Sequence, residues 1–345
     1  MDKTVFVIGA GASKEAGLPT GEELKSEICN LLDISFDFAQ QKSGDYLIAD
    51  TLRDIVRTDD GRSGDIDPYL HQARHISKAL PLAISIDNFI DSQRENKKIE
   101  LLGKLAIIRA ILKAEKESKL YYKKDRVDSS IDLNLLHDTW YLPFFQLITE
   151  NCEVSDLEDR FQSIALIIFN YDRCVEHFLI HALQKYYPVN ESEAADLISR
   201  ISIYHPYGSV GNLPSIGGGQ TIEFGAEPRK DQLLKLTSVI KTFTESADPE
   251  SSEILAIKEH MNVASKLVFM GFAFHKINMS LIAPINTASK SKALHCYCST
   301  FGISNSDEIV IIEQIKKMYK RNIPVHTAPV TSFNLFKEYW RSLAF

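Results

Sequence analysis

Six short apolar runs, separated by helical patterns, constrain the fold of this chain more than any other feature. Most positions of each run are apolar, most completely in residues 5–8 and 164–169 and least in residues 323–327, as expected of strands that are buried on both faces. The runs cover residues 5–8, 164–169, 201–204, 267–272, 293–298 and 323–327. Helical spacing of apolar residues is found over residues 22–32, 173–186, 231–244, 306–320 and 333–343. Buried strands that alternate with helices predict an α/β fold with a doubly wound, mostly parallel sheet of the Rossmann-like kind.

The stretch 33–159 interrupts this alternation. Apolar residues recur in it at helical spacing, at Leu101, Leu105, Ile108 and Leu112. We therefore predict one α/β domain made of residues 1–32 and 160–345, with a largely helical insertion at residues 33–159. The length of 345 residues suits this division, since domains average roughly 150 residues.

Charge and cysteine usage limit the function classes. The chain has 39 basic and 46 acidic side chains, which gives a net charge of −7. This negative charge argues against direct binding to nucleic-acid phosphates. No apolar run is long enough for a membrane span, and the amino terminus lacks the pattern of a secretory signal. The five cysteines include no C-x-x-C pair, which argues against structural zinc. We expect a cytoplasmic protein with reduced thiols, no zinc and no membrane contact.

A glycine-rich turn joins the first predicted strand to the first helix. Residues 9–13 read Gly-Ala-Gly-Ala-Ser, and such small residues let backbone amides approach a diphosphate at a helix amino terminus. The dinucleotide fingerprint G-x-G-x-x-G is incomplete because Lys14 occupies the position of the third glycine. An ordinary Rossmann dehydrogenase is therefore disfavoured.

Polar side chains follow the second and third predicted strands. Asn170 and Asp172 come after one strand and His205 after the other, at the edge where open α/β sheets bind ligands. Asp172 also suits a helix cap, and His205 a turn cap, so structural roles stay open for both. The glycine-rich stretch 208–225 predicts a mobile loop at the same edge.

Four motifs occur in the order G-A-G-A-S-x-x-x-G-L-P, F-N-Y-D, Y-H-P-Y-G-S-V and V-F-M-G-F-A-F-H-K-I-N. Together they resemble the sirtuin superfamily, and its divergent prokaryotic branch more than the protein deacylases. The resemblance implies that NAD⁺ is bound as a substrate. The residues that it assigns to NAD⁺ are Gly9, Ala10, Gly11, Ala12, Ser13, Gly17, Asp172, Gly208, Gly271, Phe272 and Asn278. The catalytic residues that it implies are Asn170, Asp172 and His205, with His205 as the base.

The motifs depart from the deacylases in two places. Deacylases follow the loop proline with an acid and then Phe-Arg, whereas Pro19 is followed here by Thr20, Gly21 and Glu22. In that family the phenylalanine shields the reactive ribose, so its absence opens the C1′ centre to water. The zinc-ribbon module is also missing. We therefore expect hydrolysis of NAD⁺ to nicotinamide and ADP-ribose. NAD-dependent protein deacylation, cyclisation of NAD⁺ and a non-catalytic NAD or ADP-ribose sensor remain alternatives.

The resemblance also implies a biological setting. Many prokaryotic sirtuin-like domains act in antiviral defence by depleting cellular NAD⁺, and such an activity must be silent until it is triggered. We therefore expect control by assembly into a homo-oligomer or by a separate partner. Partners of the family include HerA-type ATPases and short Argonautes.

Overall fold

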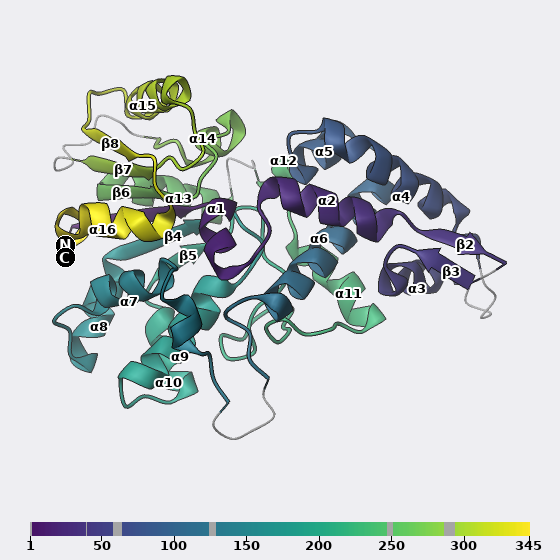
Figure 1. Ribbon diagram of the computed structural model, residues 1–345, viewed down its shortest axis with the longest axis horizontal. Helices are drawn as coiled ribbons and strands as arrows, with labels where there is room; N and C mark the ends of the chain where they lie inside the picture. Colours follow the sequence, from purple (N-terminus) through teal and green to yellow (C-terminus); the bar gives the residue numbers. More distant parts are fainter. Residues whose placement is uncertain (1, 39, 58–63, 124–128, 247–250, 286–293) are drawn as a thin grey trace.

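The computed structural model describes residues 2–38, 40–57, 64–123, 129–246, 251–285 and 294–345 (Figure 1). Six strands form one sheet in which all neighbours are parallel. In sheet order they are β5 (Ser202–Tyr204), β4 (Ile164–Ile168), β1 (Lys3–Ile8), β6 (Ala264–Met270), β7 (His295–Ser299) and β8 (Val325–Ala328). Each predicted apolar run overlaps one of these strands, although residue 293 lies outside the described residues.

The strand order shows that the sheet is doubly wound. The chain runs from β1 through β4 to β5 at one edge, returns to the other side of β1 for β6, and continues outward to β7 and β8. The direction of winding therefore reverses between β1 and β6. This order is that of Rossmann-like sheets, whose ligands bind beyond the carboxyl ends of the strands at the point of reversal. The predicted fold class is confirmed.

Helices and one short hairpin make up most of the remaining described structure. Before β4 these elements are α1 (Ala10–Ser13), α2 (Gly21–Leu32), β2 (Ser35–Asp37), β3 (Gln40–Ser43), α3 (Tyr46–Ile55), α4 (Asp67–Ala79), α5 (Ile86–Ser92), α6 (Lys97–Glu117), α7 (Tyr141–Thr149) and α8 (Leu157–Gln162). After β4 they are α9 (Cys174–Tyr186), α10 (Glu191–Ile198), α11 (Lys230–Leu236), α12 (Phe243–Ser246), α13 (Ser252–Val263), α14 (Lys276–Ile282), α15 (Asn305–Tyr319) and α16 (Ser332–Leu343). Among the described residues, no helix combines the length and apolar character needed to cross a membrane.

Alternate residues of the central strand pack into two hydrophobic layers. Val5 and Val7 belong to the layer that includes α2, α6, α13 and α15, whereas Phe6 and Ile8 belong to the layer that includes α7, α9 and α16. All four side chains are fully buried. Because both faces of β1 are covered, the strand needs apolar residues at every position, which explains the continuous run in the sequence.

The stretch 33–159 is largely helical, as predicted, with the hairpin β2–β3 added. Figure 1 shows α2 to α6 beside the sheet, whereas α7 and α8 lie under the sheet on the side of α9. Trp140, just before α7, is fully buried, and its Nε1 donates to the carbonyl oxygen of Ala12 at 3.0 Å. The stretch therefore contributes to both layers, and the boundary between the two predicted domains remains a prediction.

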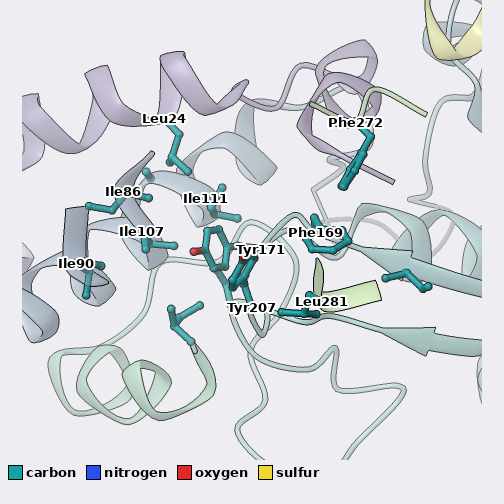
Figure 2. Packing of buried hydrophobic residues seen from close by; sticks show 14 of the residues in the cluster. Leu24, Ile86, Ile90, Ile107, Ile111, Phe169, Tyr171, Tyr207, Phe272 and Leu281 are labelled. Atoms are coloured by element: carbon teal, nitrogen blue, oxygen red, sulfur yellow. The ribbon is translucent and has the colours of Figure 1, made fainter. Parts of the chain in front are cut away.

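The insertion meets the carboxyl end of β4 through two buried tyrosines. Figure 2 shows Tyr171 and Tyr207 between Ile107 and Ile111 of α6 on one side and Phe169 on the other. The Tyr171 hydroxyl donates a hydrogen bond to Asp87 of α5. The segment that carries Asn170 and Asp172 is thus attached to the insertion.

One predicted helix is wrong. The chain is not helical throughout residues 231–244, because α11 ends early and α12 is a separate short helix. The hydroxyls of Thr237 and Ser238 donate to carbonyls in the last turn of α11, competing with the next helical amides. Ile240 then pairs with Gly208 in an isolated antiparallel bridge. The apolar spacing alone did not reveal this break.

Candidate active site

The glycine loop after β1 packs tightly against the end of β6. A Cβ atom on Gly9 would lie 2.5 Å from the carbonyl oxygen of Gly271, and one on Gly11 would lie 2.9 Å from its Cα. Gly271 itself has a φ of +55°, and a Cβ there would fall 2.0 Å from the Ala12 nitrogen. Only glycine permits this approach. The loop therefore lies where the winding of the sheet reverses.

The same packing occupies most of the loop amides. Gly9 donates to the carbonyl of Met270 at 2.9 Å, Gly11 donates to the carbonyl of Gly271 at 3.0 Å, and Ala12 donates back to Gly9 at 3.0 Å. Ala10, half-buried, opens the short helix α1. Three of the amides that the resemblance assigns to a diphosphate, those of Gly9, Gly11 and Ala12, thus donate to protein carbonyls in this structure.

Asn170 connects the end of β4 to the glycine loop through hydrogen bonds. Its Nδ2 donates to the Gly9 carbonyl at 3.0 Å and to the Ser13 hydroxyl at 2.7 Å. Both Asn170 and Ser13 are buried. The carboxamide predicted at this strand end therefore lies directly over the loop, with its donor group engaged.

Asp172 lies beside Asn170 and is almost completely buried. Its Oδ1 accepts from the backbone amide of Cys174, the first residue of α9, at 3.1 Å, whereas Arg173 occupies the N-cap position that the sequence left open for Asp172. Burial raises the pKa of Asp172, even though the Ser13 hydroxyl, Cys174 and His205 favour the charged carboxylate. Asp172 therefore belongs to the cluster and also binds the first amide of α9.

His205 joins the cluster from the end of β5. Its Nδ1 lies 3.1 Å from the carbonyl oxygen of Asn170, and its Nε2 lies 2.8 Å from Oε1 of Glu176 in the first turn of α9. Burial lowers the pKa of His205, but the Glu176 carboxylate, the Asn170 carbonyl and Asp172 together outweigh burial, so the pKa lies above its usual value. Burial raises the pKa of Glu176, and the imidazole outweighs that effect in turn, leaving a net decrease.

The partners of His205 indicate its protonation state. A carbonyl oxygen and a carboxylate can only accept hydrogen bonds. Two acceptors therefore favour an imidazolium with a proton on each nitrogen, in agreement with the raised pKa of His205. In this arrangement the ring has no lone pair available to act as a base.

The pair of His205 and Glu176 predicts a pH-dependent contribution to stability. It is complete when Glu176 is ionised and His205 is protonated, between the usual pKa values of 4.5 and 6.5. The contribution declines as the pH rises through the raised pKa of His205 or falls through the lowered pKa of Glu176. We expect Glu176→Gln to lower the unfolding free energy most in this interval.

Urea unfolding of both proteins between pH 4 and 9, with an NMR titration of the His205 ring, measures this effect. Glu150→Gln, at an exposed position, is the control. A constant difference between wild type and Glu176→Gln across this pH range would contradict the assignment.

A buried ion pair lies next to the cluster. Arg173 follows Asp172, and its Nη2 donates to Oε2 of Glu115 on α6 at 2.5 Å, with both side chains almost wholly inaccessible. Arg173 Nη1 also donates to the carbonyl of Ile222 at 2.5 Å. The pair therefore joins the insertion, the start of α9 and the glycine-rich stretch 208–225.

That stretch is an irregular loop, as predicted, and it covers a cavity beside His205. The cavity has a volume of about 330 Å³ and is lined by His205, Glu176 and Arg173 together with Ser209 and Asn212 of the loop. Volumes of about 300–1,000 Å³ are usual for ligand sites. One carboxylate oxygen of Glu176, Oε2, is buried without a hydrogen-bond partner among the described residues.

The other residues assigned to NAD⁺ surround the cluster rather than join it. Gly17 has a φ of +97° and ends the turn after α1, and Gly208 has a φ of +74° in the chain after His205. Phe272 is buried next to Gly271. Asn278 on α14 accepts a hydrogen bond from the Tyr207 hydroxyl at 2.7 Å. Gly9, Ser13, Asn170, Asp172 and His205 are the predicted residues that the structure brings together.

Two acidic residues of the site were missed. Glu176 lies in the first turn of the helix that follows Asp172, and an acid so close in sequence to a predicted site residue could have been noticed. Glu115 follows Leu112 by three residues and so continues the apolar stripe of the predicted helix. An acid at such a position indicates a buried charge with a partner.

Comparison with known proteins adds no identification, because neither the protein-family models nor the curated proteins gave a match. Within the described part of the chain, no group of three or more His, Cys, Asp or Glu residues is arranged to hold a metal ion.

Proposed function

We propose that the protein hydrolyses NAD⁺ at the bond between nicotinamide and ribose. One observation carries the proposal: Ser13, Asn170, His205 and Glu176 form a continuous hydrogen-bonded chain beside the buried Asp172. These hydrogen-bonded residues lie at the carboxyl ends of β4 and β5, next to the glycine loop. Parallel α/β sheets bind nucleotides at this edge.

The chemistry of NAD⁺ suits such a cluster. Nicotinamide leaves as a neutral molecule from a cationic pyridinium, so its departure needs no proton. Positive charge then develops at C1′ of the ribose. The buried carboxylate of Asp172 would stabilise this charge, because electrostatic interactions are stronger where water is excluded. Asn170 would orient the ribose or the attacking water.

His205 would take a proton from the attacking water or from a ribose hydroxyl. It must first lose its own Nδ1 proton and its contact with the Asn170 carbonyl. Glu176 would hold the Nε2 proton and keep the ring oriented. A general base of this kind contributes about 10²–10⁴-fold to the rate.

Hydrogen-bonding groups that would bind the substrate are already bonded within the protein, which supports an inactive resting state for the isolated chain. Gly9 and Gly11 use their amides within the protein, and His205 uses both ring nitrogens. Substrate binding would have to replace these contacts. We therefore propose that oligomerisation or a partner, such as a HerA-type ATPase or a short Argonaute, triggers cytoplasmic NAD⁺ depletion in antiviral defence.

The same closed contacts favour one alternative, a sensor that binds NAD⁺ or ADP-ribose without turnover. Chromatography of NAD⁺ incubated with the purified chain separates these functions. Release of nicotinamide and ADP-ribose supports hydrolysis, whereas a cyclic product indicates cyclisation. Nicotinamide release only after addition of an acyl-lysine peptide indicates a deacylase. Binding without any product, at every protein concentration tested, indicates a sensor.

A further inference from the structure

A second cavity, of about 340 Å³, lies between α5 of the insertion and α14. Three aromatic side chains line it, Phe169 after β4, Tyr207 after β5 and Phe243 of α12. The rings of Phe169 and Tyr207 meet edge to face with their centroids 5.8 Å apart, side by side in Figure 2. Such a wall favours a flat aromatic ring. The volume is near the lower end for ligand sites, which suits a ring or a nucleoside.

Two side-chain amides, those of Asn88 and Asn278, are part of the polar lining of this cavity. Asn278 accepts the Tyr207 hydroxyl through Oδ1 at 2.7 Å, which fixes its orientation. Its Nδ2 has no acceptor among the described residues, and neither end of the Asn88 amide has a partner there. Amides offer a donor and an acceptor together, as the edge of a nitrogen heterocycle requires.

The charge around the cavity disfavours phosphate. Asp87 and Asp91 of α5 both line it, against Lys276 of α14 and His275 just before that helix. Burial raises the pKa of Asp87 to about 6, so most of its carboxyl is ionised at neutral pH. Two carboxylates disfavour an anion and tolerate a neutral or cationic ring.

We propose that this cavity binds a planar nitrogen heterocycle that carries no phosphate next to the ring, the chemical class of a nucleobase or nucleoside. The ring packs against the edge-to-face pair of Phe169 and Tyr207 and forms hydrogen bonds with Asn278 and Asn88. Two sources share this chemistry: a free nucleoside, or a ring of a bound dinucleotide.

Isothermal titration calorimetry of the full chain with adenosine tests the proposal. We expect saturable binding, with AMP at least 10-fold weaker because its phosphate approaches Asp87 and Asp91. Asn88→Leu should weaken adenosine binding at least 10-fold, and so should Phe243→Ala, whereas Asn322→Ala, at an exposed position, should leave it unchanged. Absence of adenosine binding, AMP binding as tight as adenosine, or unchanged binding by both cavity variants would overturn the proposal.

A competition experiment distinguishes the two sources. Adenosine is titrated into His205→Ala with and without saturating NAD⁺. Loss of adenosine binding in the presence of NAD⁺ means that a ring of the dinucleotide occupies the cavity, and retained binding means that a separate nucleoside does. Both results agree with the proposal. Because adenosine binding is measured without turnover, the result tests the proposed cavity site independently of NAD⁺ hydrolysis.

Discussion

His205→Ala should abolish the release of nicotinamide from NAD⁺ while the chain remains folded. In the proposed mechanism the imidazole accepts a proton once it has lost its own Nδ1 proton, and its removal should lower the rate by about 10²–10⁴-fold. High-performance chromatography of nicotinamide against time measures the effect. Far-UV circular dichroism checks that the variant is folded.

A second variant separates catalysis from packing. His205→Ala leaves Oε1 of Glu176 without its partner, and this costs stability. His205→Gln retains an amide donor for Glu176 but has no titratable group. Both variants should lose activity equally if His205 is a base. His137→Ala, at an exposed histidine, is the control. Near-normal turnover by either His205 variant would remove the residue from the mechanism.

Glu115→Gln should reduce the free energy of unfolding by about 3–5 kcal/mol, the usual cost of leaving one charge of a buried pair without its partner. Glu115 is fully buried and the Arg173 side chain is 2% exposed. Water therefore cannot solvate the guanidinium when the carboxylate is removed. Urea denaturation of the wild type and the variant measures the difference.

Helix α6 also provides the control for this prediction. Glu117 lies two residues further along the same helix and is exposed, so Glu117→Gln should change stability by less than about 0.5 kcal/mol. A second test combines Glu115→Leu with Arg173→Met. Since neither charge is then buried, the double variant should be more stable than Glu115→Gln. Equal stability of Glu115→Gln and Glu117→Gln would show that the pair contributes little.

The sheet was predictable because its strands are covered on both faces. Residues 5–8 and 164–169 are apolar at every position, and a helix with one exposed side seldom has such a run. The helix predicted over residues 231–244 is wrong for a different reason, because side-chain hydroxyls interrupt it. Leu233, Leu236 and Ile240 are buried in the core, but hydroxyl groups at Thr237 and Ser238 compete with the helical amides and the helix ends there.

The site was predictable only in part. Asn170, Asp172 and His205 follow strands, and the carboxyl ends of parallel strands meet at one edge, so their convergence follows from the topology. The pairing of His205 with Glu176 depends on side-chain positions that a strand order does not specify. The closure of the glycine loop against Gly271 involves residues about 260 positions apart. No local pattern reveals such contacts.

The central claim is tested most directly by a crystal structure of His205→Ala with NAD⁺ bound. We predict that the nicotinamide ribose lies against Asn170 and Asp172, with C1′ facing the space left by the imidazole. The glycine loop would then have exchanged its contacts with Gly271 for the diphosphate. A dinucleotide bound away from these side chains, or no binding at any NAD⁺ concentration, would contradict the assignment.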